Sequence, residues 1–213
     1  MNGVFVTGSN TEVGKTTVSV EIIKRLSKKR KIVVRKPVET DCELVDGSYV
    51  PKDAVKLNEA CASGESLNQV CPYCFELEAS PEKASLEFGK NLSLDDLIYA
   101  CNDGVGEHFV FVEGAGGFYS PIADNALNSD LAVQLNLPVI IVVKDELGAI
   151  SQALLTINAV LSKKLQVAFV VLNEIEQNTL SNLKALNSYT DVPVLKYSKK
   201  NPESFYLKAE KLI

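Results

Sequence analysis

Residues 4–20 read VFVTGSNTEVGKTTVSV: an apolar run, a loop that contains Gly8 and Gly14, and the start of a helical pattern. This order is typical of the P-loop, whose pattern G-x-x-x-x-G-K-[ST] lies between a strand and a helix and binds phosphate. Counted back from Gly14, the first glycine of that pattern would stand at position 9, where this chain has Ser9. The sequence therefore predicts a variant P-loop at a helix start, where backbone N–H groups favour anions.

The side chains of this loop suit the phosphates of a nucleotide. Lys15 supplies a positive charge, and the hydroxyl of Thr16 is a ligand that Mg²⁺ accepts. The alternative is a glycine-rich turn that binds nothing, which the order of strand, GKT and helix disfavours. Asn10 stands where the septum-positioning and partition ATPases carry an extra lysine, which disfavours those classes. The predicted phosphate-binding residues are Thr11, Glu12, Val13, Gly14, Lys15, Thr16 and Thr17.

The composition is that of one globular α/β domain. The 213 residues are 46% hydrophobic and 23% charged, which is ordinary for a folded chain with a sizeable core. The net charge of −5 argues against a surface for nucleic acid or for an anionic membrane. No apolar stretch approaches the ~20 residues of a membrane span. No signal peptide is visible, and the five cysteines are an odd number, so we expect reduced thiols and a cytoplasmic location.

Six apolar runs indicate the strands of a parallel sheet, because most are continuously apolar, as in strands buried on both faces. The runs are GVFVTG (3–8), KIVVRKP (31–37), HFVFVEG (108–114), LPVIIVV (137–143), LQVAFVVLN (165–173) and the weaker DVPVLKY (191–197). Helical patterns lie between them. We therefore predict a doubly wound, mostly parallel sheet with helices on both faces, formed by residues 1–213 as a single domain. Residues 38–92 are predicted to be an irregular insertion with one helix, at 52–62.

Helix signals are clearest at three places. One apolar helix face comprises Val18, Ile22, Ile23 and Leu26, and another comprises Ile150, Ala153, Leu154, Ile157 and Leu161. Both have the spacing of a helix that packs one side against a sheet. Ser93 and Asp96 stand in the positions of a capping box, which predicts a further helix start.

Polar residues follow the ends of the predicted strands, where ligands bind in sheets of this kind. Lys36, held extended by the following proline, would stand beside the P-loop and stabilise a transferring phosphoryl group; the alternative is a surface lysine. Glu113 follows four apolar residues, and a Mg²⁺ ion would explain a buried carboxylate there; the alternative is an exposed acid in a glycine-rich turn. Asp53 would be a further Mg²⁺ ligand, beside Thr16 and Glu113; the alternative is that it caps a helix. Asn173 would face the edge of a nucleobase; the alternative is a residue of a turn.

Six segments follow one another between about residues 4 and 174: VTGSNTEVGKT, KPVET, VEGAGGFYSPI, LPVIIVV, LGAISQALLT and VLNE. Together they resemble the dethiobiotin synthetases of biotin biosynthesis. The resemblance implies a P-loop NTPase fold and a ring-closing ligase that uses ATP and Mg²⁺. In that reaction CO₂ carboxylates one amine of 7,8-diaminononanoate, ATP phosphorylates the carbamate, and the second amine closes a cyclic urea.

The resemblance also implies roles for the residues that match the family's motifs. Lys15 and Lys36 would be catalytic, and Thr16, Asp53 and Glu113 would hold Mg²⁺. Besides the P-loop, the implied nucleotide-binding residues are Asp53, Glu113, Gly114, Ala115, Gly116, Asn173 and Glu174. The implied substrate-binding residues are Thr40, Gly117, Gly148, Ala149, Ile150 and Ser151, the last four from the partner subunit of a homodimer. We expect this sharing because the helix that begins at Gly148 should lie several strand positions from the P-loop.

The chain departs from the family's pattern in three places, one of which is Asp41, where the family commonly has a glycine after KP-x-x-T. The segment SPEKAS has Glu82 where the family often has a histidine. The late loop that faces adenine is expected at YSKKNPE (197–203), where Lys199 and Lys200 replace apolar residues. The choice of nucleobase is therefore open.

Two other functions are alternatives on the same loop: a nucleotide-gated regulatory module and a small-molecule kinase. Lys36, Thr40 and Glu113 together favour the ligase, because a nucleotide sensor needs the P-loop but not a second lysine. A kinase would usually carry an arginine-rich lid, and the basic cluster SKKRKIVV instead leads into a strand.

Overall fold

A six-stranded sheet forms the centre of the molecule, in the order β12-β11-β10-β1-β7-β2, and every neighbouring pair is parallel. The computed structural model describes residues 1–213. The strands are β1 (Gly3–Gly8), β2 (Ile32–Arg35), β7 (Phe109–Gly117), β10 (Val139–Lys144), β11 (Val167–Glu174) and β12 (Val194–Ser198). All six predicted strands are present, and the predicted parallel, doubly wound class is confirmed.

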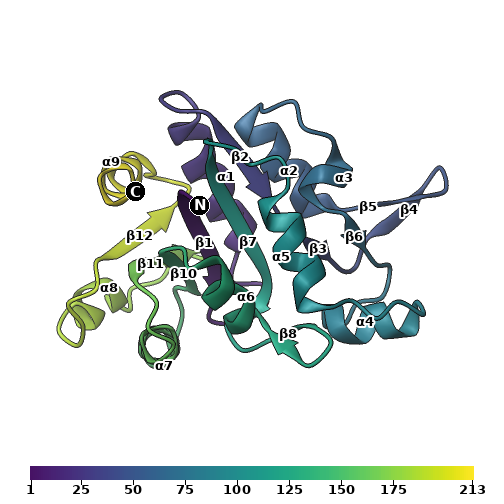
Figure 1. Cartoon of the computed structure of the whole chain (residues 1–213). Helices are drawn as coiled ribbons and strands as arrows, with labels where there is room; N and C mark the ends of the chain where they lie inside the picture. The colour runs from purple at the N-terminus through teal and green to yellow at the C-terminus, as the bar shows by residue number, and fades with distance from the viewer.

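Helices cover both faces of this sheet (Figure 1). One face carries α1 (Lys15–Leu26), α2 (Lys52–Cys61) and α9 (Glu203–Leu212); the other carries α5 (Leu94–Asn102), α6 (Asn128–Leu135), α7 (Ala149–Ser162) and α8 (Asn182–Leu186). Each face has its own apolar core, and successive residues of β1 alternate between them: Phe5 enters one core, and Val4 and Val6 enter the other. No helix is both long and apolar enough to cross a bilayer.

The helix predictions hold for α1 and α5 and only in part for α7. The predicted face of α1 is buried, and Ser93 and Asp96 form the capping box of α5. In α7 the buried residues are Ala149, Ala153, Thr156, Ile157 and Val160. Leu161, predicted on that face, is 49% exposed. One residue past Val160 turns the side chain by about 100°, which carries Leu161 off the buried stripe. The helices α6 and α9 were not predicted.

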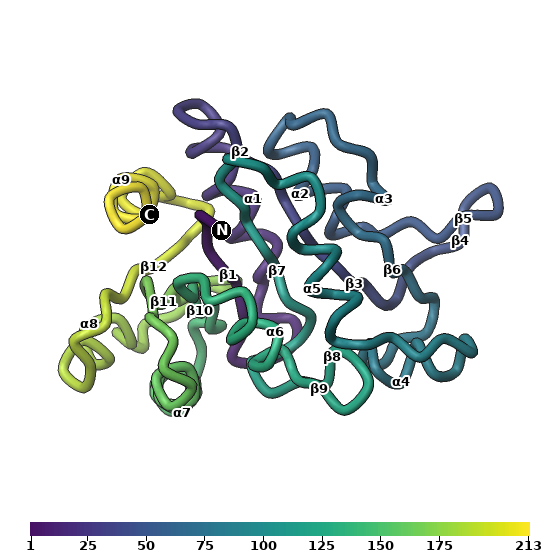
Figure 2. The backbone as a smooth tube through the Cα atoms, in the orientation of Figure 1, coloured from purple at the N-terminus to yellow at the C-terminus, as the bar shows by residue number.

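The helix predicted at 52–62 is present as α2, but the segment 38–92 contains more regular structure than that single helix, so the prediction of an otherwise irregular segment is wrong. Besides α2 it has α3 (Leu67–Val70) and α4 (Pro81–Glu87), and the short pairs β3 (Val38–Glu39) with β6 (Tyr73–Cys74) and β4 (Glu43–Val45) with β5 (Ser48–Val50). Such short elements carry too few apolar positions to show a period. A further short pair, β8 (Pro121–Ala123) with β9 (Ala126–Leu127), follows β7. Figure 2 shows the inserted segment, in blue, on the β2 side of the sheet.

The strand that precedes α7 does not lie where the sequence reasoning placed it. β10 pairs directly with β1, with Phe5 opposite Val139, so α7 begins one strand away from the P-loop strand rather than several. The hydroxyl of Ser9 donates a hydrogen bond of 3.0 Å to Gln152 Oε1, which ties the P-loop to the first turns of α7. An apolar run shows that a strand is buried but not which strands lie beside it, and this is why the expectation was wrong.

Candidate functional site

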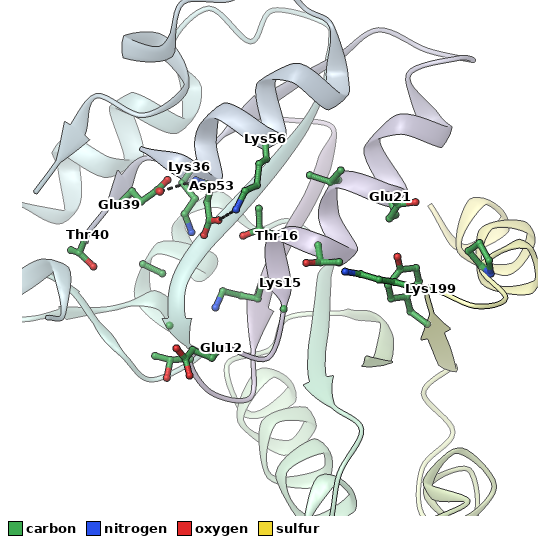
Figure 3. A pocket seen from close by; sticks show the side chains of 18 of the residues that line it. Glu12, Lys15, Thr16, Glu21, Lys36, Glu39, Thr40, Asp53, Lys56 and Lys199 are labelled. Atoms are coloured by element: carbon green, nitrogen blue, oxygen red, sulfur yellow. Dashed lines mark hydrogen bonds and ion pairs between the residues drawn. The ribbon is translucent and has the colours of Figure 1, made fainter. Parts of the chain in front are cut away.

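A cavity of 740 Å³ lies between the P-loop, the segment after β2, the start of α2 and the loop after β12. Figure 3 shows Lys36 and Asp53 at one end of it, Glu21 and Lys199 at the other, and Lys15 between them. Its lining residues are Thr11, Glu12, Gly14, Lys15, Thr16, Thr17, Val20, Glu21, Lys36, Glu39, Thr40, Asp53, Lys56, Ala115, Gly116, Tyr197, Lys199, Pro202 and Tyr206. The cavity size is within the usual range for a small-molecule site.

The P-loop has the geometry of an anion site at a helix start. Gly14 precedes α1 with a φ of +81°, a left-handed conformation that glycine adopts without strain. A Cβ added to Gly14 would also lie 2.2 Å from Asn173 Nδ2, so a larger residue does not fit. No side chain caps α1, and its first residue, Lys15, lines the cavity. The first N–H groups of α1 are therefore available to a bound anion.

Lys15 binds its proton less firmly than an ordinary lysine. Its side chain is almost fully buried. Burial and then repulsion by Lys36 lower the pKa of Lys15 to about 8, against the attraction of Glu113 and Asp53. A phosphate placed beside the ammonium would stabilise its charged form, so nucleotide binding should raise this pKa again.

We therefore expect ADP without Mg²⁺ to bind more weakly as the pH rises above about 8. Below that pKa Lys15 already carries its proton; above it, binding must take up a proton, so the affinity falls by up to about tenfold per pH unit. Calorimetric titration from about pH 6.5 to 9.5 checks this. Lys15→Met is the control, with weak and nearly pH-independent binding. Equal slopes in the two proteins would show that another group titrates.

Glu113 is a buried carboxylate with a full set of partners. It is 1% exposed. Its Oε1 accepts hydrogen bonds from Thr16 Oγ1 at 2.8 Å and from Lys36 Nζ at 3.2 Å, and its Oε2 accepts one from Ser19 Oγ at 2.7 Å. These contacts join the first turns of α1 to the end of β2. The exposed position that the sequence left open for Glu113 is thereby excluded.

Lys36 is a buried, charged lysine beside the P-loop. Its side chain is almost fully buried, and its Nζ also donates to the carbonyl of Gly114 at 3.1 Å. Burial alone would lower the pKa of Lys36, but the carboxylates of Glu113, Asp53 and Glu39 outweigh that effect and raise it above the usual value. A surface position for Lys36 is excluded, and the cavity carries a fixed positive charge at this end.

Thr16, Asp53 and Glu113 offer the oxygen donors that a hard cation prefers. The hydroxyl of Thr16 donates a hydrogen bond to the Glu113 carboxylate at 2.8 Å, and Thr16 and Asp53 both line the cavity. Burial would raise the pKa of Asp53, but Lys36 and the Thr16 hydroxyl outweigh burial and lower it, so the carboxylate is ionised. Mg²⁺ is usually held by one or two carboxylates, with water and nucleotide phosphates as its other ligands. The donor set fits that ion.

Several predicted nucleotide residues do not line the cavity. Val13, Glu113, Gly114, Asn173 and Glu174 are not part of its wall, nor is Gly117 of the predicted substrate set. The amide Nδ2 of buried Asn173 donates to the Val13 carbonyl at 2.9 Å, so this residue supports the P-loop. Glu174 accepts a hydrogen bond of 2.7 Å from Lys196. Thr40, predicted to contact the substrate, does line the cavity.

The start of α7 stands apart from the cavity of its own chain. Gly148, Ala149, Ile150 and Ser151 are all absent from the lining. Gly148 caps α7 with a φ of +94° and no side-chain hydrogen bond, and Ser151 is exposed. The structure therefore does not bring these four predicted substrate residues together with the others in one chain.

The cavity is also lined by residues to which the sequence motifs assigned no role. They are Val20, Glu21, Glu39, Lys56 and Tyr206. The hydroxyl of Tyr206 donates a hydrogen bond to the carboxylate of Glu21, and burial, with this contact, raises the pKa of Tyr206. Tyr206 belongs to α9, which was not predicted. In this part of the chain only the preceding segment 197–203 was predicted to reach the nucleotide. Within that segment Tyr197, Lys199 and Pro202 reach the cavity.

Comparison with known proteins agrees with the sequence resemblance. A family model described as an AAA domain matches residues 2–197. A relative from Vesicomyosocius okutanii is 46% identical over 100% of this chain and 97% of its own length, and one from Ruthia magnifica is 45% identical over 100% and 99%. Both are named ATP-dependent dethiobiotin synthetase. The chain belongs to the dethiobiotin synthetase family.

Solved structures place this dethiobiotin synthetase family member among the P-loop ATPase folds. The septum site-determining protein MinD from Pyrococcus horikoshii, complexed with Mg-ADP, has a TM-score of 0.54 at 18% identity, with 100% of this chain and 89% of that chain covered. A plasmid partition protein from Borrelia burgdorferi has a TM-score of 0.59 at 11% identity, with 100% and 96% covered. At these identities the likeness concerns the fold alone.

Proposed function

We propose that this chain is a Mg²⁺- and ATP-dependent ring-closing ligase that makes dethiobiotin from 7,8-diaminononanoate, CO₂ and ATP, through a carbamate and a carbamic-phosphoric anhydride. Full-length similarity to ATP-dependent dethiobiotin synthetases supports this. The observation that carries the proposal is the second lysine: Lys36 is buried and charged in the same cavity as Lys15. A module that only senses a nucleotide needs the P-loop lysine but has no use for a second buried ammonium.

The charges of the cavity suit phosphoryl transfer to a carbamate. The γ-phosphate would lie on the first N–H groups of α1 and on Lys15, and the carbamate oxygens would lie against Lys36. Negative charge that develops between them would meet two ammonium groups already in position. Glu113, in contact with Lys36 at 3.2 Å, would keep that lysine in place during transfer. The second amine would then attack the anhydride carbon, lose its proton and displace phosphate.

The metal and the diamine would occupy the same end of the cavity. Thr16, Asp53 and Glu113 would hold Mg²⁺, which when bound neutralises charge on the β- and γ-phosphates. Thr40, on the segment that follows Lys36, would contact the diamine end of the substrate.

We also infer a homodimer in which each subunit completes the partner's substrate site. The start of α7 would bind the substrate carboxylate, because a helix N-terminus favours an anion. Two apolar side chains flank that start: Leu147 is 87% exposed and Leu155 is 68% exposed. Ser151 and Leu155 are one turn apart, so they share a face of α7. Exposed apolar side chains grouped in this way are typical of an interaction surface.

The proposed activity is tested by ADP release from ATP in the presence of 7,8-diaminononanoate and bicarbonate, with each omitted in turn. We expect ADP only when all are present, with one cyclic urea formed per ADP, as measured by mass spectrometry. A kinase would release ADP without bicarbonate and would leave a phosphorylated product. A regulatory module would release no more ADP than the protein-free control. Either result would contradict the ligase.

A further inference from the structure

Glu39 lies in the cavity wall but has no part in the chemistry proposed above. Its side chain is almost fully buried. Its backbone is held by the short β3–β6 pair, in which Glu39 stands opposite Cys74 and its carbonyl accepts the N–H of Phe75 at 3.0 Å. The Glu39 side chain therefore extends from a backbone position that is fixed by the insertion.

The carboxylate of Glu39 caps α2 from a distance in sequence. Its Oε1 accepts the backbone N–H of Asp53 at 2.8 Å, and its Oε2 accepts that of Ala54 at 2.9 Å. The local cap position of α2 is Pro51, which makes no side-chain hydrogen bond. Glu39 thus satisfies two of the free N–H groups of this helix start and places a negative charge there, where the helix dipole favours it. Figure 3 shows Glu39 beside Asp53.

We propose that Glu39 is a positioning residue that orients Asp53 for Mg²⁺ binding. This inference rests on the proposed function, in which Asp53 is a metal ligand. The Asp53 carboxylate accepts a hydrogen bond of 3.4 Å from Lys56 Nζ and lines the cavity together with Thr16. By accepting the N–H groups of Asp53 and Ala54, Glu39 fixes the first turn of α2, and with it the Asp53 backbone, relative to the segment that carries Lys36. Groups that orient a metal ligand commonly affect metal affinity by about 10–100-fold.

The charge of Glu39 serves the same arrangement. Glu113 is the ion-pair partner of Lys36, at 3.2 Å, and the carboxylates of Asp53 and Glu39 also attract its charge. If Glu39 were neutral, one fewer carboxylate would compete with Asp53 for the charge of Lys36. The Asp53 carboxylate would then be drawn away from the metal and toward the Lys36 ammonium. Glu39→Gln is the sharpest variant, because it keeps the volume but removes the charge and turns one acceptor oxygen into a donor that faces an N–H group.

The test is Mn²⁺ binding in the presence of ADP, measured by electron paramagnetic resonance, which does not depend on turnover. We expect Glu39→Gln to weaken Mn²⁺ binding by about tenfold, and Asp53→Asn to weaken it at least as much. In the double variant Glu39→Gln/Asp53→Asn the loss should equal that of Asp53→Asn alone, because the two residues act through one ligand. Glu39→Asp, which keeps the charge but not the reach, should lie between wild type and Glu39→Gln.

A matched control removes a different helix cap. Ser93 accepts the N–H of Asp96 at 3.2 Å at the start of α5, outside the cavity, so Ser93→Ala should lower the unfolding temperature and leave Mn²⁺ affinity unchanged. If Asp53→Asn weakens Mn²⁺ binding but Glu39→Gln and Glu39→Asp stay within about twofold of wild type, the role of Glu39 is refuted and the proposed metal site stands. If Asp53→Asn has no effect, the proposed metal ligand is wrong, and the inference fails with it.

Discussion

Replacing Lys36 with alanine should lower kcat by about 10²–10³ while nucleotide still binds. The ammonium of Lys36 is buried and ion-paired with Glu113 at 3.2 Å, so it is in place before the reaction begins. A group that stabilises charge only as it develops affects kcat more than substrate binding. Steady-state kinetics with ATP and the diamine, together with calorimetric titration of ADP, measure the two effects separately.

The same substitution has a structural cost that needs its own control. Removing one partner of a buried ion pair destabilises a protein by about 3–5 kcal/mol, here because Glu113 would lose its charged neighbour. Thermal unfolding of Lys36→Ala, with and without ADP, shows whether the folded protein is present in the assay. Lys36→Met, which keeps most of the volume, is the second variant. Turnover within about threefold of wild type in either folded variant would remove Lys36 from the mechanism.

The P-loop and the strands could be predicted because their signals are local. A loop of this pattern, between an apolar run and a helical pattern, is complete within residues 4–20. The buried positions of Lys36 after β2 and of Glu113 within β7 could be inferred in the same way, because each lies within two residues of an apolar run. Their contact at 3.2 Å then follows from the adjacency of β2 and β7.

The remaining features depend on contacts between distant segments. Glu39 caps a helix that starts at Lys52, and nothing near Glu39 in sequence indicates that helix start. Tyr206 reaches Glu21 because α9 packs beside α1, a contact between the two ends of the chain. The place of β10 beside β1 is likewise set by strand order, which apolar runs do not encode. Local patterns therefore identified most of the cavity wall and missed Val20, Glu21, Glu39, Lys56 and Tyr206.

Mixing two inactive variants should restore activity if the substrate site is shared between subunits. The cavity that holds Lys36 is not lined by Gly148, Ala149, Ile150 or Ser151 of the same chain. A substrate held at Lys36 would therefore not reach the start of α7 in the same chain. In an isologous dimer each chain could lend that helix start to its partner. One variant is Lys36→Ala, and the other is Ser151→Asp, whose carboxylate would repel that of the substrate.

In a mixed dimer one site would carry both lesions and the other neither. Random re-association gives about half mixed dimers, so the mixture should regain about a quarter of wild-type activity. Ser151→Asn, of similar size but without the charge, should lose much less activity than Ser151→Asp, which separates charge repulsion from crowding. Native mass spectrometry of the two variants, one labelled with heavy isotopes, verifies that mixed dimers form. If they form and the mixture stays inactive, the substrate is bound within one chain, and the start of α7 is not part of the partner's site.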